Sequence, residues 1–599
     1  MNQPTLGLLD RLRPPSGYRT VAALGATYSA DLLTCMAVLT TLDGGEGEQV
    51  RYGRIEAFRA LDRLRDKVRI CHEAGRVSRR DGAKYPSLTL LDRVLVPVRL
   101  PGRGSFHPKV WLVRQRQADE VGRERFVLIV SSRNITTSTD WDLGIAVEGG
   151  PAGDGVPLPR VRGFAEHALT LAGDLGRLET FGKLDDVRWT LPPHIREMVF
   201  DFQAGGDAPR KLHGEWDTFA VRASRVLLLS PFIDGHMVEE AARRWRGVSK
   251  RWLVGGIDGL TSVALGPNRD DLRAFEPRQI VAAADVPDSS EAETGEEGAD
   301  EIEQTRALHA KVIAIDNGRK GTVVVGSNNL TSSGWCGGST EAFVRLIGDA
   351  TLCDPLWDWA GAQAQLFDFP ELGSPEPKPS ILEQVRDSLH DVLFRLEDIG
   401  LGTPSHLVML NPPTLELPDG VQLEVARYTT PRALVPFPSG GSTVDLPGCA
   451  PALRTRFVVC VVREGDDEAA WIVAAELEPP LGDERDRELV ARLLGFRQFL
   501  AYLHSLHSDE AIMGPFEGDP DDDPSGEESR RAQASLIDNV HLEGLLRQLV
   551  GKQEAFEEMD RAVERYGELI KKSQLLPAEL VLLGRFLEAW AAIREAFRK

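Results

Sequence analysis

The chain contains 599 residues, of which 42% are hydrophobic and 27% are charged. This composition is typical of a folded globular protein and excludes collagen-like, disulfide-scaffold and wholly disordered chains. The length predicts about three to four folded units. The formal net charge is −21, so the overall charge of the protein does not attract a polyanionic partner. Such a partner must bind a local basic surface.

The six cysteines are scattered along the chain without CxxC or CxxH spacing, so neither a zinc site nor a disulfide framework is indicated. We therefore expect no metal and no cofactor. The first residues lack a basic-then-apolar signal pattern, and the apolar run 21–42 is interrupted by polar residues. We expect a cytoplasmic protein without a membrane partner.

The first predicted unit occupies residues 1–150. A strand pattern followed by an amphipathic helix pattern covers 21–39, and two further strand patterns cover 106–113 and 125–136. The last of these strands leads into a loop that contains an asparagine. A connector with some helix is predicted for 151–214.

The second predicted unit, 215–370, repeats this order. A strand-and-helix pattern at 225–245 is followed by strand patterns at 308–316 and 321–331. Because strands alternate with helices, each repeat is predicted to be an α/β sandwich with a mixed sheet. The acidic insert 285–303 is predicted to be a solvated loop, and the alternative is a mobile flap that competes with a polyanionic substrate.

The C-terminal half has a different pattern. Short strands between Pro- and Gly-rich turns predict a β-rich domain with flanking helices at 380–510, and helix patterns predict a helical region at 530–599. No catalytic constellation stands out here. The predicted role of this half is recognition, regulation or self-association.

Polar residues surround the last two predicted strands of the second repeat. His309, Lys311 and Asp316 fit the pattern H-x-K-x4-D, and Ser327 and Asn329 follow in a G-S-x-N pattern. One such match in a chain of this length is uncommon, but chance can produce it.

The first repeat carries a near-match at the corresponding place. His107 and Lys109 are followed by Ser132 and Asn134, while Arg114 occupies the position of the aspartate. Two matches at equivalent positions of a duplicated unit form a strong signal.

These residue types suit the cleavage of a phosphodiester bond. Residues two apart on a strand project from the same face, so each His-x-Lys pair can point to one place. The reaction needs an in-line nucleophile, a proton for the leaving oxygen and donors to the remaining phosphate oxygens. Two histidines, two lysines and two asparagines meet these needs without a metal.

Over residues 1–350 the paired motifs resemble those of the phospholipase D superfamily, whose members build one active site from two such motifs. The resemblance implies two tandem α/β sandwich repeats related by pseudo-two-fold symmetry, followed here by a small β-rich domain and a C-terminal helical region. The first motif, which lacks the aspartate, is similar to the motifs of tyrosyl-DNA phosphodiesterases. Arg114 is therefore not expected to inactivate the site.

The resemblance also implies a role for each residue. His107 is expected to attack phosphorus and form a phosphohistidine, and His309 to protonate the leaving oxygen, although the spacing alone leaves the opposite assignment open. The lysines and asparagines would bind the phosphate. Glu341 matches a carboxylate that orients the nearby histidine. In repeat one Asp142 is the best candidate for this role, and Asp140 is a weaker candidate.

Five other residues near the motifs receive weaker assignments. Ser132 and Ser327 lie two positions before the asparagines, and each hydroxyl is expected to donate one more hydrogen bond in the site. Asp316 completes the second motif in a supporting role. Trp141 and Trp335 are predicted either to stack a base at the mouth of the site or to pack in the core.

The segment 51–84 carries eleven Lys and Arg residues against five Asp and Glu residues. This local excess favours a surface that binds a nucleic-acid backbone. The alternative is a solvated helix laced with ion pairs.

The leading hypothesis is a metal-independent phosphodiesterase that acts on nucleic acid, with DNA favoured as the substrate. It would be a nuclease or a DNA-end-processing enzyme, in a restriction or anti-phage context. One alternative is a phospholipase D or phosphatidyltransferase that acts on lipid headgroups, but we find no secretion signal or membrane-binding helix in the sequence. The other alternative is a catalytically silent scaffold protein.

Overall fold

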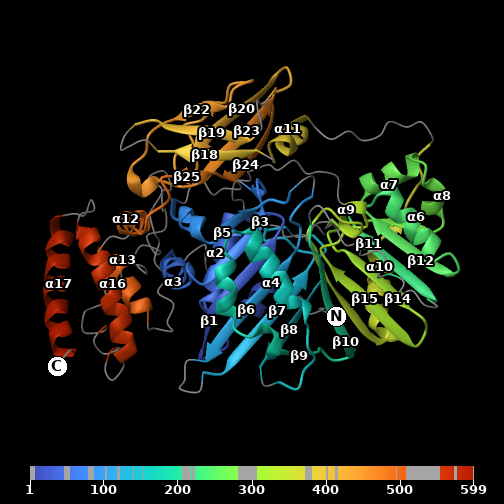
Figure 1. Cartoon of the computed structure of the whole chain (residues 1–599), viewed down its shortest axis with the longest axis horizontal. Coiled ribbons are helices and arrows are strands. Elements are labelled where there is room, and N and C mark those ends of the chain that lie inside the picture. Colours follow the sequence, from blue (N-terminus) through green and yellow to red (C-terminus); the bar gives the residue numbers. More distant parts are fainter. Residues whose placement is uncertain are drawn as a thin grey trace, which may run out of the picture.

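The fold is described by a computed structural model of the chain (Figure 1). The described residues are 7–45, 54–78, 86–101, 104–117, 122–138, 140–151, 153–205, 216, 223–280, 307–371, 381–390, 392–398, 403–411, 416–493, 496–506, 545, 549, 553–571 and 577–597. The acidic insert 285–303 therefore lies outside the described residues.

The first repeat is built on a seven-stranded sheet with the order β5-β3-β1-β6-β7-β8-β9. Its strands are β1 (Tyr18–Thr27), β3 (Val68–Glu73), β5 (Leu95–Val98), β6 (Val110–Gln117), β7 (Glu124–Ser131), β8 (Gly144–Gly150) and β9 (Arg188–Thr190). Strands β1, β3 and β5 run parallel to one another, whereas β6, β7 and β8 pair antiparallel. Neighbouring residues of β1, such as Ala23 and Leu24, enter different hydrophobic cores. Burial on both faces explains why β1 is an almost continuous apolar run.

The second repeat is built on an eight-stranded sheet with the order β10-β16-β15-β14-β11-β12-β13-β17. Its strands are β10 (Ile195–Gln203), β11 (Arg225–Ser230), β12 (Lys250–Gly255), β13 (Glu276–Gln279), β14 (Val312–Asp316), β15 (Lys320–Gly326), β16 (Glu341–Asp349) and β17 (Gln365–Leu366). Strands β11, β12 and β13 are parallel, and β14, β15 and β16 are antiparallel. This sheet is therefore mixed in the same way as the first.

Six strands of each sheet follow one common order, because β13-β12-β11-β14-β15-β16 matches β5-β3-β1-β6-β7-β8. Helices α2 (Leu32–Leu42) and α6 (Gly235–Arg244) follow the first strand of each repeat and are capped by Asp31 and Asp234. Residues of both sheets share one hydrophobic core. The expected fold class, two α/β repeats with mixed sheets, is confirmed.

The remaining helices of this half cover the sheets. They are α1 (Leu8–Leu12), α3 (Arg54–Leu64), α4 (Arg160–Leu171), α7 (Ile257–Leu265), α8 (Arg269–Arg273), α9 (Ser332–Trp335) and α10 (Asp354–Gln363), with the short 3-10 helices η3 (Pro86–Arg93), η4 (Leu175–Phe181), η5 (Leu184–Asp186) and η7 (Ala350–Cys353). The segment predicted as a connector, 151–214, adds β9 to the first sheet and β10 to the second. It thereby ties the two repeats together.

The β-rich part has a four-stranded sheet, β22-β19-β18-β25, and contributes β24, β23, β20 and β21 to a six-stranded one. Its elements are α11 (Ile381–His390), β18 (Leu393–Glu397), β19 (Ser405–Asn411), β20 (Val421–Arg427), β21 (Val435–Pro436), β22 (Thr443–Leu446), η8 (Pro451–Leu453), β23 (Phe457–Glu464), β24 (Asp467–Ala474) and β25 (Glu476–Glu478). Helices α12 (Asp483–Leu493), α13 (Phe496–Ser505), α16 (Gln553–Lys571) and α17 (Pro577–Phe597) follow. The β-rich part and the helical region expected after the repeats are therefore present.

The six-stranded sheet joins the β-rich part to the first repeat. Its two remaining strands, β2 (Ala30–Asp31) and β4 (Val77–Ser78), belong to repeat one, and β4 pairs with β24. Beside this sheet the guanidinium of Arg485 lies 3.0 Å from the buried carboxylate of Asp92, which also accepts a hydrogen bond from Thr455. The sequence predicted a separate domain at 380–510 and did not indicate this shared sheet.

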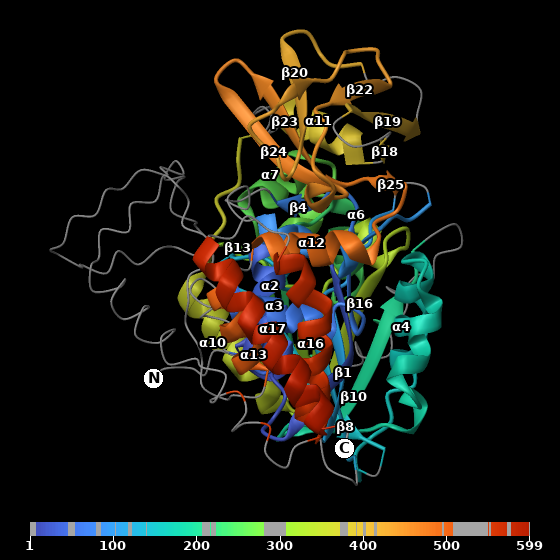
Figure 2. The same ribbon diagram turned by 90° about the vertical axis from the view of Figure 1, so that its left-hand side faces the viewer.

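The C-terminal helices pack beside α2 and α3 (Figure 2). Arg63 of α3 forms an ion pair of 2.8 Å with Glu558 of α16, and the hydroxyls of Tyr502 and Tyr566 donate to Asp62. Repeat one is therefore covered on this side by the end of the chain. Within the described residues, no helix has both the length and the apolar character needed to cross a bilayer.

Candidate active site

The two His-x-Lys segments lie directly before β6 and β14, where the two repeats meet. Phe106 forms a parallel bridge with Thr340, and Leu308 forms one with Trp141. The backbone N–H of His107 donates to Thr340 at 2.9 Å, and that of His309 donates to Trp141 at 2.9 Å. Each motif is thus held by the backbone of the other repeat.

The two lysines are placed identically. The Nζ of Lys109 donates to the carbonyl of His107 at 2.9 Å, and the Nζ of Lys311 donates to the carbonyl of His309 at 2.8 Å. Both side chains are buried. Burial and the charge of Lys311 lower the pKa of Lys109 well below its usual value, and burial lowers the pKa of Lys311 to about 8. The two ammonium groups are therefore close enough for the charge of Lys311 to act on Lys109.

A carboxylate from the opposite repeat orients each histidine. Glu341 of repeat two lies 3.0 Å from Nδ1 of His107, and Asp142 of repeat one lies 2.7 Å from Nδ1 of His309. The sequence predicted that Glu341 and Asp142 each orient a nearby histidine, without indicating which one. The structure places each carboxylate beside the histidine of the other repeat, so the pairs are crosswise.

The serines hold these carboxylates. Ser132 Oγ donates to Asp142 at 2.7 Å, and Ser327 Oγ donates to Glu341. Each serine oxygen also accepts a backbone N–H at 3.0 Å, from Leu143 for Ser132 and from Ala342 for Ser327. The hydroxyl hydrogens are therefore used by carboxylates, and the expected further bond within the site goes to these groups.

The asparagines follow on adjacent loops. The Oδ1 of Asn134 accepts weak hydrogen bonds from Thr27 Oγ1 at 3.4 Å and from the N–H of Ser29 at 3.5 Å, and this orients its amide nitrogen the other way. In repeat two, the residue after Asn329 donates its N–H to Ser230 Oγ at 2.8 Å. Both asparagine loops are thus fixed to the end of the first strand of their repeat.

The two histidine pairs differ in charge. Burial and the neighbouring lysines lower the pKa of His107 well below its usual value, and burial raises the pKa of Glu341 to about 8. Burial acts to raise the pKa of Asp142, but its hydrogen bond with His309 and that from Ser132 outweigh it and lower the pKa. The carboxyl group of Asp142 therefore loses its proton more readily than that of Glu341. The hydrogen bond with Asp142 acts to raise the pKa of His309, but burial and the neighbouring lysines outweigh it and lower that pKa.

Asp316 lies away from the histidines. It sits opposite Arg225 in the β11–β14 pair, and its Oδ2 accepts from Arg225 Nε at 2.7 Å. In repeat one, Arg114 instead bonds to Glu124 and to the carbonyl of Thr180. The motif aspartate therefore has a structural contact in repeat two, and repeat one replaces that contact with different partners.

Tyr28 is near the site, and the sequence analysis missed it. Its ring meets the ring of His107 edge-on at 4.9 Å, and Lys109 Nζ lies 5.7 Å from its centre. The signal that could have found it is its position directly after the first strand of a repeat, where side chains at the carboxyl end of parallel strands reach a shared site.

The two tryptophans near the motifs, Trp335 and Trp141, differ in burial. Trp335 is buried and packs edge-on against Trp216 at 5.2 Å, which favours the core alternative. Trp141 is half-buried beside Asp142 and meets Trp359 edge-on at 5.6 Å.

Four arginines of the basic segment 51–84 are paired with carboxylates. Ion pairs join Arg59 to Asp43, Arg63 to Glu558, Arg65 to Asp486 and Arg69 to Asp174, at 2.8 to 3.3 Å. These four arginines are therefore used in ion pairs with other elements, and not in the pairs along one solvated helix that the alternative predicted. Arg51, Arg79, Arg80 and Lys84 lie outside the described residues.

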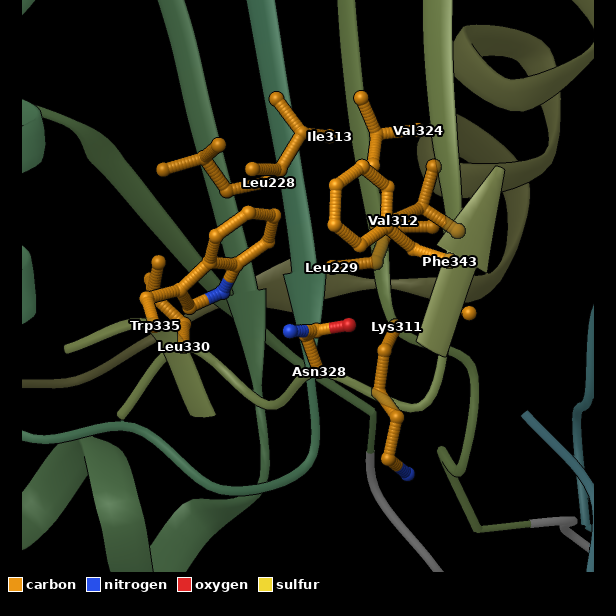
Figure 3. Close-up of a pocket in the computed structure, with 11 residues that line it drawn as sticks. Leu228, Leu229, Lys311, Val312, Ile313, Val324, Asn328, Leu330, Trp335 and Phe343 are labelled. Carbon is orange, nitrogen blue, oxygen red and sulfur yellow. The ribbon is translucent and has the colours of Figure 1, made fainter. Parts of the chain in front are cut away.

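A small cavity lies behind Lys311, within the core of repeat two (Figure 3). Aliphatic side chains, Trp335 and Phe343 line it, and Asn328 and Lys311 lie at one end of it. The buried Asn328 amide donates to the carbonyl of Gly334 at 2.7 Å. The cavity, of about 10 Å³, is the size of one water molecule and has no room for a larger ligand.

No family model matches the chain, and no curated protein matches it. Among solved structures, a polyphosphate kinase from Porphyromonas gingivalis is 13% identical with a TM-score of 0.33, over 64% of this chain and 52% of that one. A mutant of yeast tyrosyl-DNA phosphodiesterase is 12% identical with a TM-score of 0.35, over 57% of this chain and 84% of that one. Phosphatidylserine synthase from Haemophilus influenzae Rd KW20 is 11% identical with a TM-score of 0.36, over 64% and 89%. The chain thus spans about half the length of the polyphosphate kinase.

Proposed function

We propose that the chain is a metal-independent phosphodiesterase of the phospholipase D type. The observation that carries the proposal is the crosswise pairing of His107 with Glu341 and of His309 with Asp142, at 3.0 and 2.7 Å, beside two buried lysines. A catalytically silent scaffold would have no use for two buried lysines that repel each other.

The reaction would proceed in two displacements. The Nε2 of His107 attacks phosphorus and the P–O bond to the leaving group breaks, while His309 gives its proton to the leaving oxygen. His309 then removes a proton from water, whose oxygen attacks phosphorus and releases His107. The lysines and the asparagine amides neutralise the phosphate oxygens in both steps.

The roles of the histidines follow the difference between the carboxyl groups. Ionised Asp142 stabilises a protonated His309, which suits an acid. His107 is partly buried against Glu341 and has a lowered pKa, so its ring stays neutral and nucleophilic. This asymmetry supports His107 as the nucleophile.

Nucleic acid is the substrate that we propose, with DNA favoured over RNA, and the enzyme would be a nuclease or a DNA-end-processing enzyme. Its support is the Asp-less first motif, which is similar to the motifs of tyrosyl-DNA phosphodiesterases. A restriction or anti-phage role and self-association of the C-terminal half stay hypotheses.

The test is incubation of the full chain with labelled single- and double-stranded DNA and RNA in EDTA, with phosphatidylcholine as the lipid control. Wild type should cleave nucleic acid in EDTA, His309→Ala should not, and the exposed His236 provides a matched control variant, His236→Ala, with normal activity. An acid quench should trap a phosphohistidine. Loss of activity on chelation, or hydrolysis of the lipid alone, would contradict the proposal.

A further inference from the structure

Two large apolar side chains are exposed where the parallel strands of repeat two end. Phe232, which follows β11, is 62% exposed, and Ile257, which follows β12, is 56% exposed. Because β11 and β12 are parallel neighbours, their carboxyl ends lie at one edge of the sheet. Figure 1 shows the helices that follow these strands, α6 and α7, at the same end of repeat two.

The two side chains come from segments in contact. The N–H of Gly256 donates to the carbonyl of Pro231 at 3.3 Å. A Cβ placed on Gly259 would lie 3.1 Å from the side chain of Ile233. The loop that carries Phe232 and the first turn of α7 therefore form one continuous surface.

This surface adjoins the candidate active site. The N–H of Leu330 donates to Ser230 Oγ at 2.8 Å, and the N–H of Asp234 donates to the carbonyl of Leu330 at 3.1 Å. Leu330 directly follows Asn329. The loop with Phe232 is thus bonded on both sides to the loop that presents a phosphate-binding asparagine.

Repeat one differs at the same place. Thr27 Oγ1 donates to the carbonyl of Ser29 at 2.8 Å, as Ser230 Oγ donates to that of Phe232 at 2.6 Å. Ser29 therefore corresponds to Phe232. The repeat-one side of the site has a small polar side chain here, and the repeat-two side has an exposed aromatic ring.

We propose that Phe232 is a specificity-determining residue that stacks on the nucleobase of the nucleotide on the repeat-two side of the scissile phosphate. The proposal rests on the proposed nuclease function and adds a direction: one side of the bond is recognised through a base, and the other side is not. An exposed aromatic ring beside a phosphate site is a sequence-tolerant platform for a base.

A bilayer is the other surface that an exposed phenylalanine could enter. Stable binding there needs a larger apolar surface supported by basic residues. Here the apolar surface consists of Phe232 and Ile257, and the exposed carboxylate of Asp258 directly follows Ile257. An anionic membrane repels this carboxylate. The observations therefore favour a nucleobase.

The experiment uses the full chain with His309→Ala, so that binding is measured without turnover, and a single-stranded oligonucleotide that contains 2-aminopurine. Stacking should quench its fluorescence. Phe232→Ala should remove the quench and weaken binding about ten-fold or more, Phe232→Trp should restore both, and Phe232→Leu should not. Leu175→Ala, at a site 46% exposed in repeat one, is the matched control and should change neither.

The outcomes separate the two proposals. Binding and quenching that Phe232→Ala leaves unchanged would overturn the stacking role even if wild type cleaves the strand. Rescue by Phe232→Leu together with binding to phosphatidylglycerol vesicles would overturn it in favour of a membrane. A quench that depends on Phe232 in a chain whose wild type cleaves no nucleic acid would support the stacking and reject the nuclease.

Discussion

The two repeats agree where they would touch a phosphate and differ where they would touch the rest of a substrate. Both place a lysine Nζ on the carbonyl of its own histidine, at 2.9 and 2.8 Å. They differ in the carboxyl group that they supply, which is Asp142 in repeat one and Glu341 in repeat two, and in the residue two positions after the first strand, which is Ser29 or Phe232. They also differ in their covering, because the C-terminal half packs on repeat one. In the proposed mechanism, the duplicated part would bind the phosphate, and the differences would determine the acid, the nucleophile and the direction of the substrate.

The largest expected effect is the loss of activity when the histidine of either repeat is replaced. His107→Ala and His309→Ala should each lower the rate about 100- to 10,000-fold, because one removes the nucleophile and the other removes the proton donor. Steady-state cleavage of labelled DNA measures this, with His236→Ala as the control. Full activity in the His107 variant would show that repeat one does not supply the nucleophile.

A second prediction tests the covering of repeat one. Arg485→Ala should lower the free energy of unfolding by about 3 kcal/mol, because it removes the guanidinium that pairs with the buried carboxylate of Asp92 at 3.0 Å and leaves only the positive charge of Arg456 near it. Urea denaturation followed by circular dichroism measures the change. The exposed Arg432 gives a control, Arg432→Ala, with little change. Equal stability of the two variants would mean that the β-rich part contributes little to repeat one.

The two carboxyl groups should not be equivalent. Asp142→Asn should lower kcat about 100-fold, because it removes the charge that stabilises protonated His309. Glu341→Gln should lower kcat less, about 10-fold, since an amide oxygen can still accept from His107 Nδ1. Single-turnover rates measure both variants. The reverse order would exchange the roles of the two histidines.

Asp316 should matter for stability and not for chemistry. Asp316→Ala should lower the free energy of unfolding by about 1–3 kcal/mol, because it removes the carboxylate held by Arg225 at 2.7 Å. Thermal unfolding measures the loss, and activity at low temperature should stay near that of wild type. A large drop in activity of the folded variant would show that this position acts in the site.

The smallest effect is a shift in pH dependence. Lys311 has a pKa of about 8, so it is charged below this value and loses its charge as the pH rises through it. The kcat/KM of wild type should therefore fall above about pH 8, and Lys311→Arg, which keeps its charge, should move that fall to higher pH. Lys320→Arg, on an exposed lysine, is the control. If the fall of kcat/KM stays at the same pH in Lys311→Arg, a group other than Lys311 causes it.

Local patterns predicted what depends on neighbouring residues. The apolar run of β1 and the spacing of His309 and Lys311 are short-range features, and they indicated the repeats and the motif residues. The crosswise partners were missed because they depend on how two loops meet, with Phe106 beside Thr340, and no spacing within one motif records that contact.

The basic segment 51–84 also shows that local patterns do not predict long-range contacts. Its charge excess was read from residues close in sequence, but Arg65 and Arg63 find their partners 421 and 495 positions away, in Asp486 and Glu558. The shared sheet was missed for this reason too, since β4 and β24 carry no local signal that they pair. Long-range pairing is where sequence patterns stop being informative.

The crosswise site has a consequence during synthesis. Repeat one leaves the ribosome first, yet the carboxylate that orients its histidine, Glu341, is 234 positions after His107. Until repeat two has folded, a nascent chain presents a histidine without its partner and a carboxylate, Asp142, without its own. In the proposed mechanism, a chain that ends before Glu341 lacks the group that orients His107 and would be inactive.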